Sequence, residues 1–361
     1  VYKKEIMKIA INGFGRIGRL TFRRLIDNKN AQIVAINDLT DPKTLAHLLQ
    51  YDTAHRKFNH EVSFDDKHII VDGRYIPLFA ERDATNLPWE KLEVDVVAEC
   101  TGFYRTTEKA MIHIKAGAKK VVISAPATAD IKTIVLGVNE GDITADDHII
   151  SNASCTTNCL APMAKIMLDN FGVESGFINT VHAYTSDQNL QDSPHSDLRR
   201  ARAAGDSIIP TSTGAAKAVG WVIPELSGKL DGIANRVPVL TGSLTDFTLL
   251  VEKEVRVDSI KRAFQEAAAG SYGGVLKYTE EPLVSSDIIS SSYSCIFQGD
   301  LVSVQGRLVK LIAWYDNEMG YFRQLNDGSV ENSWNFVDFD TLDDKMREEM
   351  ELIAEHILCN M

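Results

Sequence analysis

A single thiol stands at the centre of a run of small polar residues, Ser151-Asn-Ala-Ser-Cys-Thr-Thr-Asn-Cys159. Residues 147–150 before it are typical of a short strand, and residues 160–171 carry apolar side chains at helical spacing. Cys155 is therefore predicted where a helix begins, and unpaired N–H groups and the helix dipole there favour a thiolate. This position predicts a lowered cysteine pKa and a nucleophile, although an arbitrary cysteine is more often a small buried side chain.

His182 supplies the proton acceptor that thiol chemistry requires. It lies in the second half of a predicted strand, residues 176–185. A histidine in an apolar strand is commonly a core residue, but a Cys–His pair is the arrangement that activates a thiol. We therefore predict Cys155 and His182 as the catalytic residues. The spacing of the remaining cysteines predicts neither a metal site nor a disulfide framework, and we interpret them as structural: Cys100, Cys159, Cys295 and Cys359.

A glycine motif near the N-terminus predicts a dinucleotide site. Gly13-Phe-Gly-Arg-Ile-Gly18 separates a predicted strand, residues 8–12, from a helical pattern, and a second strand, residues 32–36, leads to Asp38. Glycines let the backbone approach a pyrophosphate at a helix N-terminus, and an acidic residue about 20 positions later can bind ribose hydroxyls. A carboxylate at Asp38 would repel the 2′-phosphate of NADP, so the predicted cofactor is NAD. The alternative is a structural turn and a surface aspartate.

The remaining predicted strands indicate two kinds of sheet. Strands at 94–98 and 119–124 continue a parallel sheet, whose carboxyl ends bind ligands; polar residues there are predicted cofactor contacts: Asn12, Thr101 and Ser124. Each could equally be an ordinary polar strand end. Later strands at 246–251, 290–297 and 308–315, with a helix at 259–269, indicate a mixed sheet. The predicted fold is α/β: an N-terminal Rossmann parallel-sheet domain, then an α+β catalytic domain with a mostly antiparallel mixed sheet.

Arginines and hydroxyl groups in the second half indicate an anion site. The polar segment 185–206 contains Arg200 between two other arginines, and Thr213 and Gly214 precede a predicted helix. Guanidinium groups and helix N-terminal N–H groups bind phosphate. Arg236, at a strand edge, is a further candidate. The alternative interpretation of this segment is a solvated surface loop.

Composition limits the classes of partner. The 361 residues are 44% hydrophobic and 24% charged, as in an ordinary globular protein of two domains. A formal charge of −12 argues against a general affinity for nucleic acid. No apolar run approaches the roughly 18 residues of a membrane span, and scattered cysteines favour a reducing, cytoplasmic location.

Six separated motifs, in one order, resemble the phosphorylating glyceraldehyde-3-phosphate dehydrogenase family. They are Ile11-Asn-Gly-Phe-Gly-Arg-Ile-Gly-Arg19, Ser151–Cys159, Thr180-Val-His-Ala-Tyr-Thr185, Asp197-Leu-Arg-Arg-Ala-Arg202, Thr213-Gly-Ala-Ala-Lys-Ala-Val219 and Trp314-Tyr-Asp-Asn-Glu318. The resemblance implies a glycolytic enzyme that oxidises glyceraldehyde 3-phosphate with NAD and inorganic phosphate, through a cysteine thioester. It also implies a homotetramer in which the segment 185–206, the arginine loop, lies against the cofactor of a neighbouring subunit.

Residue roles follow from this resemblance position by position. Cys155 is implied as the nucleophile and His182 as its partner. Cofactor contacts are implied by the glycine loop and by matching positions: Asn12, Gly13, Gly15, Arg16, Ile17, Gly18, Asp38, Leu39, Thr101, Ser124 and Asn317. Inorganic phosphate is implied to contact Ser154, Thr156, Arg200, Thr213 and Gly214, and the substrate's own phosphate Thr185 and Arg236. Leu39 and Pro194 match the NAD-using branch.

The expected domain division places the cofactor domain at 7–154, with about 318–332 returning to it, and the catalytic domain at 155–317. Two features depart from the family. Met319 stands where Trp is usual, and we expect local repacking there. Residues 333–361 form an acidic extension with apolar residues on one helical stripe, which suggests a helix docked on the enzyme's own surface or, alternatively, a partner-binding helix.

Two other functions remain open at this point. An erythrose-4-phosphate dehydrogenase uses the same thiol chemistry, but that branch departs from the 180–185 and 213–217 patterns that this chain keeps. A non-catalytic protein that only binds a dinucleotide or nucleic acid is the second alternative. The retained Cys155 and His182 argue against it.

Overall fold

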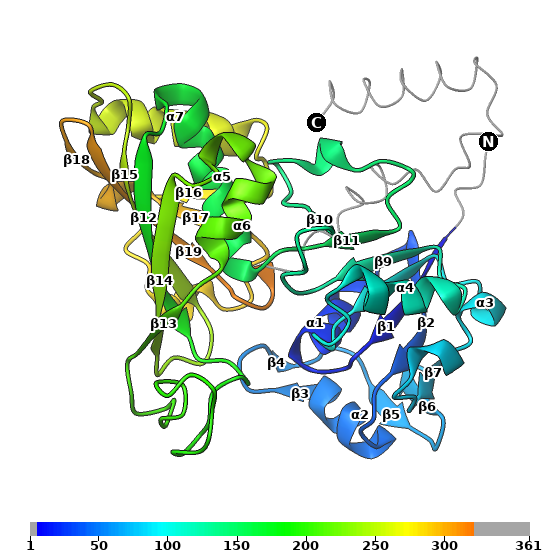
Figure 1. Cartoon of the computed structure of the whole chain (residues 1–361). Coiled ribbons are helices and arrows are strands. Elements are labelled where there is room, and N and C mark those ends of the chain that lie inside the picture. Colours follow the sequence, from blue (N-terminus) through cyan, green and yellow to red (C-terminus); the bar gives the residue numbers. More distant parts are fainter. Residues whose placement is uncertain (1–5, 321–361) are drawn as a thin grey trace, which may run out of the picture.

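Two β-sheets organise the chain (Figure 1). The computed structural model describes residues 6–320. Within this range, sheet 1 has nine strands in the order β10 (Lys132–Thr133), β11 (Ile149–Ser151), β9 (Lys120–Ile123), β8 (Val96–Glu99), β1 (Met7–Asn12), β2 (Ala31–Asn37), β7 (Arg74–Phe79), β6 (His68–Val71) and β5 (Val62–Phe64). All pairs from β10 to β7 are parallel, and β5, β6 and β7 pair antiparallel.

Helices cover both faces of sheet 1 because its central strands alternate between two cores. On β1, Ile9 and Ile11 pack in a cluster with Phe22 of α1 (Arg16–Leu25) and with α2 (Pro42–Gln50). Ala10, between them, faces a second cluster with α3 (Trp89–Leu92) and α4 (Thr107–Lys115). The Rossmann-type parallel sheet predicted from the sequence is confirmed.

Sheet 2 is mixed and mostly antiparallel, as expected. Within the described residues its main order is β13 (Ile209–Ser212), β14 (Leu230–Val237), β12 (Ser175–Ala183), β15 (Ser243–Leu250), β19 (Leu308–Tyr315), β17 (Cys295–Gln298) and β16 (Leu276–Thr279), and β18 (Ser303–Gln305) also pairs with β19. The β12–β14 and β16–β17 pairs are parallel, and the others are antiparallel.

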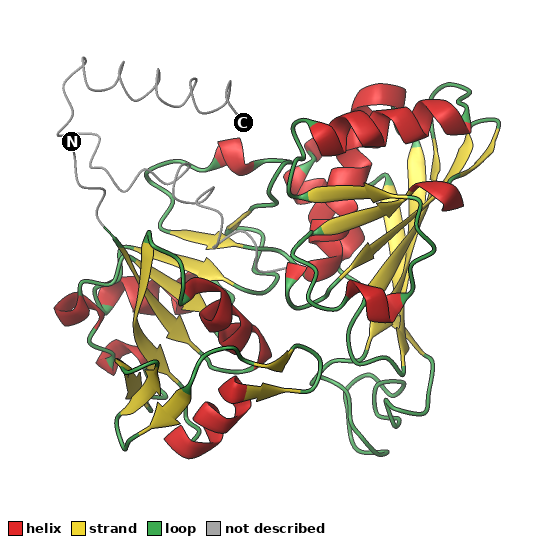
Figure 2. Ribbon diagram, turned by 180° about the vertical axis from the view of Figure 1, so that it is seen from behind, coloured by secondary structure: helices red, strands yellow, loops and turns green. Residues whose placement is uncertain are grey.

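Three helices pack on one face of sheet 2 (Figure 2). They are α5 (Cys155–Phe171), α6 (Ala215–Val222) and α7 (Val257–Ala269), and their buried side chains share one core with β15, β17 and β19. Phe177 of β12 and Ile233 of β14 are exposed, at 70% and 50%. Apolar side chains of this sheet therefore remain uncovered within the described chain.

Small elements complete the described chain. A two-stranded pair joins β3 (Tyr51–Asp52) to β4 (Arg56–Lys57), and the 3₁₀ turns are Ala84–Asn86, Glu140–Asp142, Pro224–Leu226, Ser285–Ile288 and Gly299–Leu301. No helix in residues 6–320 combines the length and apolarity needed to cross a bilayer.

The strand predicted at 290–297 is wrong over its first half. Ser290 has a left-handed φ of +68°, and its N–H donates to the Asp316 carboxylate at 2.7 Å instead of to a strand neighbour. Residues 290–294 therefore begin in a turn at Ser290, and β17 starts only at Cys295.

The expected return of 318–332 to the first domain lies almost wholly outside the described residues, as does the extension at 333–361. The division at 154 and 155 stays a prediction. Cys155 itself packs against both the core of sheet 2 and the α1–α2 core of sheet 1.

Candidate active site

The turn between β11 and α5 places Cys155 at the first residue of its helix, as the sequence predicted. Ser154 is the N-cap, and its side chain accepts a hydrogen bond from the Thr157 N–H at 3.1 Å. Ala153, just before the cap, has a left-handed φ of +57°, which costs a non-glycine residue about 1 kcal/mol. The chain thus holds a strained turn directly beside the thiol.

Cys155 and His182 lie in contact. The Cys155 Sγ is 3.3 Å from the His182 Nε2, across the gap between α5 and β12. The His182 Nδ1 lies 2.6 Å from the Ala183 carbonyl oxygen, which can only accept a hydrogen bond. The Arg236 Nη1, which can only donate, lies 2.7 Å from the same Nδ1 and 3.1 Å from the Ala183 oxygen. With the ring proton on Nδ1 and directed at the carbonyl oxygen, Nε2 is free to accept the thiol proton. The geometry suits a thiol nucleophile with an adjacent base.

Burial sets the resting protonation of this pair. It raises the pKa of the Cys155 thiol to about 11, although the Arg236 charge and hydrogen bonds at the helix start act in the other direction. It also lowers the pKa of His182 to about 3, and the Arg236 charge adds to that effect. The lowered thiol pKa expected from the helix position is therefore wrong. The pair rests as a neutral thiol and a neutral imidazole, and the nucleophile forms as its proton moves to Nε2.

Alkylation of Cys155 by iodoacetamide is expected to accelerate continuously between about pH 6 and about pH 10, since the thiolate is the reacting form and its fraction rises towards the raised pKa. The measurement is the pH–rate profile, with the labelled peptide identified by mass spectrometry. Cys155→Ser provides the background. A rate plateau below about pH 7 would show a preformed thiolate–imidazolium pair and contradict this assignment.

A cavity of about 210 Å³ surrounds the pair. Its lining includes Ser154, Cys155, Thr156, His182, Arg200, Thr213, Gly214 and Arg236, all named from the sequence. The start of α6 joins the start of α5 here, and neither helix has an acidic residue in its first turn. Two helix N-termini and two guanidinium groups make the cavity a strong anion site. Thr185, two residues beyond β12, does not line this cavity.

Arg200 is held from outside the cavity. Its Nη1 donates to the Asp187 carboxylate at 2.5 Å and its Nε to the Thr211 hydroxyl at 2.9 Å. Although burial acts against ionisation of Asp187, its contacts with Arg200 outweigh this and lower its pKa. Within the described chain the Arg236 Nε has no hydrogen-bond partner, while its Nη1 donates to the Ala183 carbonyl at 3.1 Å. Arg236 thus keeps donor capacity for an anion.

The glycine loop fits a dinucleotide. Gly13 has φ of +93°, and a Cβ there would lie 2.8 Å from Thr101, so the loop packs tightly on the end of β8. A Cβ on Gly18 would lie 2.0 Å from the Gly13 carbonyl oxygen, whereas one on Gly15 would meet open space. Helix α1 has no side-chain cap and no acidic residue in its first turn, so its N–H groups can take a pyrophosphate.

The other predicted cofactor residues lie near the carboxyl edge of sheet 1 or beyond β19. Asp38 accepts from the Phe14 N–H at 2.7 Å and from the Thr40 N–H at 2.9 Å, which ties it to the glycine loop. Asn317 accepts on Oδ1 from the Gly242 N–H at 3.2 Å and from two hydroxyls, so its Nδ2 is the donor left for a ligand. Ile17, Thr101 and Ser124 are at least partly exposed, and Leu39 is exposed.

Two family models match the chain. Residues 7–107 match the glyceraldehyde 3-phosphate dehydrogenase NAD binding domain, and residues 154–317 match the C-terminal domain of the same family. The glyceraldehyde-3-phosphate dehydrogenases of Clostridium acetobutylicum and Clostridium pasteurianum are each 55% identical over 324 residues, which is 88% of this chain and 96% of each relative. The chain belongs to the glyceraldehyde-3-phosphate dehydrogenase family.

Membership in the glyceraldehyde-3-phosphate dehydrogenase family supports NAD as the cofactor, in agreement with the sequence prediction. Cys159 and Cys295 are fully buried and Cys100 is partly buried, as expected of structural cysteines. Among residues 6–320, no group of His, Cys, Asp and Glu could hold a metal ion.

Several groups that hold the named residues in place were not predicted from the sequence. Asp187 anchors Arg200, and the Tyr315 hydroxyl contacts the hydroxyls of Thr156 and Thr180 at 2.9 and 2.7 Å. Ser212 also lines the cavity. Tyr315 lies within the motif Trp314–Glu318, which could have marked it, whereas no local signal marks Asp187 or Ser212.

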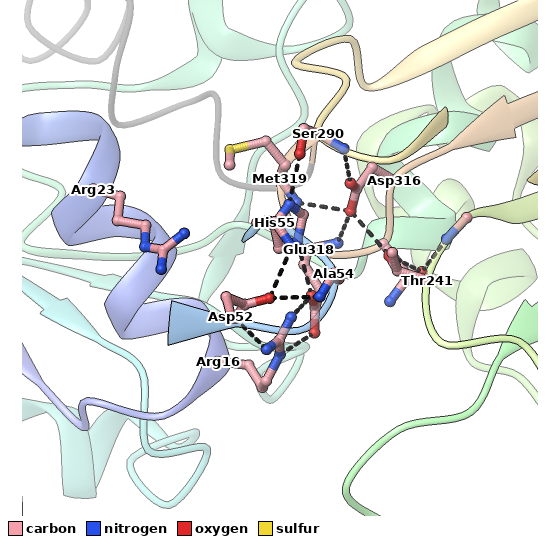
Figure 3. A network of polar contacts seen from close by, with 12 residues as sticks. Arg16, Arg23, Asp52, Ala54, His55, Thr241, Ser290, Asp316, Glu318 and Met319 are labelled. Atoms are coloured by element: carbon pink, nitrogen blue, oxygen red, sulfur yellow. Dashed lines mark hydrogen bonds and ion pairs between the residues drawn. The ribbon is translucent and has the colours of Figure 1, made fainter. Parts of the chain in front are cut away.

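Arg16 links the glycine loop to the segment after β19. Figure 3 shows its guanidinium between Asp52 and Glu318, and its Nε donates to the Glu318 Oε1 at 2.7 Å. His55 Nε2 contacts the same carboxylate at 3.1 Å. Although burial acts to raise the pKa of Glu318, its contacts with Arg16 and His55 outweigh this and lower it. Met319 lies beside this network and donates its N–H to Asp316.

Replacing Glu318 by Gln is expected to lower the free energy of unfolding by about 2 kcal/mol, because a partly buried guanidinium would lose a charged partner. Urea denaturation measures the change. The matched control is Glu174→Gln, which breaks an ion pair to Arg307 whose side chains are 41% and 40% exposed. That control should change stability by less than about 0.5 kcal/mol. Equal losses of unfolding free energy in Glu318→Gln and Glu174→Gln would show that the ion pairs of Arg16 stabilise the fold no more than an exposed ion pair does.

Proposed function

We propose that this chain oxidises glyceraldehyde 3-phosphate to 1,3-bisphosphoglycerate, with NAD as the oxidant and inorganic phosphate as the acyl acceptor. The observation that carries the proposal is the Cys155 Sγ placed 3.3 Å from the His182 Nε2 inside the arginine-lined cavity. A thiol with an adjacent base suits covalent attack on an aldehyde. Two guanidinium groups beside it suit a substrate and a co-substrate that both carry phosphate.

The residues supply each proton transfer of this reaction. As the Cys155 sulfur bonds to the aldehyde carbon, the thiol proton moves to the His182 Nε2 and then to the new oxyanion, which gives a hemithioacetal. The Cys155 N–H and the imidazole stabilise negative charge on that oxygen. Bound NAD would supply the acceptor for the hydride of this carbon. His182 takes back the hydroxyl proton, and a thioester to Cys155 remains.

Phosphate then attacks the thioester carbonyl, and the Cys155 sulfur leaves as the acyl phosphate forms. The departing sulfur takes the proton held on the His182 Nε2, which restores the neutral thiol and the neutral imidazole. We assign the inorganic phosphate to Arg200, Thr213 and Gly214 with Ser154 and Thr156, and the substrate's phosphate to Arg236 and Thr185. Support comes from the shared cavity, which includes every one of these residues except Thr185. The start of α6 at Gly214 adds backbone donors to the first of these two sites.

Cofactor placement follows from the fit of sheet 1 to a dinucleotide. We assign the pyrophosphate to the start of α1 with Arg16 and Ile17, the adenosine ribose to Asp38 with Leu39 nearby, and the nicotinamide to the Asn317 amide. Asn12, Thr101 and Ser124 then border the cofactor at the strand ends.

We also propose a homotetramer in the cytoplasm. Exposed apolar side chains support an assembly: Phe177 and Ile233 on sheet 2, and Leu190, Leu198 and Ile208 in and just beyond the arginine loop. Light scattering after size exclusion measures the mass. A monomer of about 40 kDa at micromolar concentration would contradict the assembly.

The direct test of function follows NADH absorbance with purified protein, glyceraldehyde 3-phosphate, NAD and phosphate. We expect turnover of glyceraldehyde 3-phosphate to require both NAD and phosphate, and to be faster than turnover of erythrose 4-phosphate. Faster turnover of erythrose 4-phosphate would favour the related dehydrogenase. NAD binding without turnover of either aldehyde would favour a non-catalytic protein.

A further inference from the structure

A fully buried carboxylate lies under the cofactor edge of sheet 1, and the proposed chemistry does not use it. Glu99 is the last residue of β8 and has no exposed surface, and His113 of α4 beside it is equally buried. Burial of a carboxylate is unfavourable unless hydrogen-bond donors surround it. The groups around Glu99 therefore decide what it does.

Four donors from three residues converge on this carboxylate. Glu99 Oε1 accepts from the Thr101 N–H at 2.8 Å and from the Thr101 hydroxyl. Glu99 Oε2 accepts from the Asn12 Nδ2 at 2.5 Å and from the His113 Nε2 at 3.1 Å. Two of these three residues, Asn12 and Thr101, are assigned above to the cofactor site.

The direction of the histidine contact is determined by Trp89. An indole N–H can only donate, and the Trp89 Nε1 lies 3.2 Å from the His113 Nδ1. His113 therefore accepts at Nδ1 and carries its proton on Nε2, which donates to Glu99.

The direction of the asparagine contact is determined by a backbone group. The Glu81 N–H donates to the Asn37 Oδ1 at 2.8 Å, so the Asn37 Nδ2 is the atom that donates to the Asn12 Oδ1 at 2.7 Å. The Asn12 Nδ2 consequently faces Glu99. Every neighbour is a donor, and only a side chain that accepts at both oxygens satisfies them all.

These contacts join strand ends that border the cofactor. Asn12 closes β1 just before the glycine loop, and Thr101 follows β8. The Ser124 N–H, after β9, donates to the Glu99 main-chain oxygen at 2.9 Å. Because a Cβ on Gly13 would be only 2.8 Å from Thr101, a shift of the β8 end would move the glycine loop with it.

We infer that Glu99 is a positioning residue for the cofactor: its buried carboxylate holds the ends of β1 and β8 together, so that the glycine loop and Thr101 keep the spacing that NAD requires. This inference rests on the proposed function for the identity of the ligand. It assigns Glu99 no contact with the substrate or with the reacting atoms.

The test replaces Glu99 by Gln in the full chain. Glutamine keeps the size of the side chain but turns an N–H group towards a donor, so one contact must break. The KM for NAD and the Kd for NAD from a direct titration are expected to rise roughly tenfold, as when a supporting hydrogen bond to a ligand site is lost. The kcat and the KM for phosphate should stay within about twofold.

Trp89→Phe is the matched control. It removes packing and the indole hydrogen bond to His113 from the same core. All four donors to Glu99 remain, because the carboxylate can only accept and therefore still selects the His113 tautomer with its proton on Nε2. Its melting temperature should fall while the KM for NAD stays near the wild-type value. An unchanged NAD Kd in Glu99→Gln, or an equal rise in Trp89→Phe, would overturn the inference, since either result indicates a purely structural role.

A second variant tests the inference if Glu99→Gln does not fold. Asn37→Ala removes the donor to the Asn12 Oδ1 together with two hydrogen bonds to the Glu81 backbone, and it leaves Glu99 itself unchanged. It should raise the NAD Kd roughly threefold; an unchanged Kd would overturn the inference. The titration also separates the two proposals. A wild-type chain that binds NAD without turning over an aldehyde would refute the proposed function and leave the role of Glu99 to be decided by the same variants.

Discussion

Cys155→Ser is expected to lower kcat for glyceraldehyde 3-phosphate by at least about 10⁴-fold, because no other thiol of residues 6–320 adjoins His182 and a hydroxyl neither attacks nor leaves as well as sulfur. Steady-state NADH absorbance measures the loss. The fold should be retained, since serine is nearly the same size and is tolerated at a helix start. NAD affinity should therefore be unchanged, which a fluorescence titration checks.

Cys159→Ala is the control for that variant. Cys159 lies one turn further along α5, is fully buried and does not line the cavity. Its loss should cost stability, about 1 to 2 kcal/mol, and leave kcat within a few-fold. Residual activity above about 1% in Cys155→Ser, or an equal loss in Cys159→Ala, would refute Cys155 as the nucleophile.

His182→Asn is expected to lower kcat by about 10³-fold, while the KM for the aldehyde changes by less than about tenfold. The physical reason is the neutral resting pair. With burial raising the pKa of Cys155 to about 11, the thiol proton needs an acceptor at the moment of attack, and an amide cannot accept it.

The pH dependence of kcat provides a second test of His182 as the base. Since burial lowers the pKa of His182 to about 3, the imidazole stays neutral and able to accept a proton down to about pH 4. Wild-type kcat should then show no loss with an apparent pKa near 6.5. A fall of kcat through that value, or a loss below tenfold in His182→Asn, would contradict the base role.

These expectations depend on how α5 and β12 meet. The local pattern around residue 155 predicted a strand, a turn and a helix, and the structure has β11, a left-handed turn at Ala153 and α5 in that order. The pattern around 182 predicted only a strand. The 3.3 Å contact between the two side chains requires the sheet that places β12 beside the start of α5.

The thiol pKa illustrates where local reasoning stops. A helix start favours a thiolate, and this lowering effect on the thiol pKa is correctly predicted from the sequence. Burial against two cores raises the thiol pKa by more than the helix start lowers it, and this burial depends on residues distant in the chain. Only the assembled structure decides which of the two effects is larger.

The roles of Glu99 and Asp187 could not be predicted from the local sequence either. Each is an acidic residue in a stretch of unremarkable composition, and neither belongs to a motif. Glu99 becomes important because β1 and β8 are neighbours in sheet 1, and Asp187 because the arginine loop folds back on itself. Hydrogen bonds between residues far apart in sequence leave no spacing that could be recognised.

The sequence by itself determined the two kinds of sheet, the dinucleotide loop, the NAD-favouring Asp38 and the cysteine at a helix start. Periodicity, glycine spacing and residue chemistry are local properties, so they survive in a bare string of letters. Tertiary structure decided the Cys155–His182 contact, the convergence of two helix N-termini and two arginines on one cavity, and the neutral state of the resting thiol. Those depend on distance and burial, which arise only when separate elements pack together.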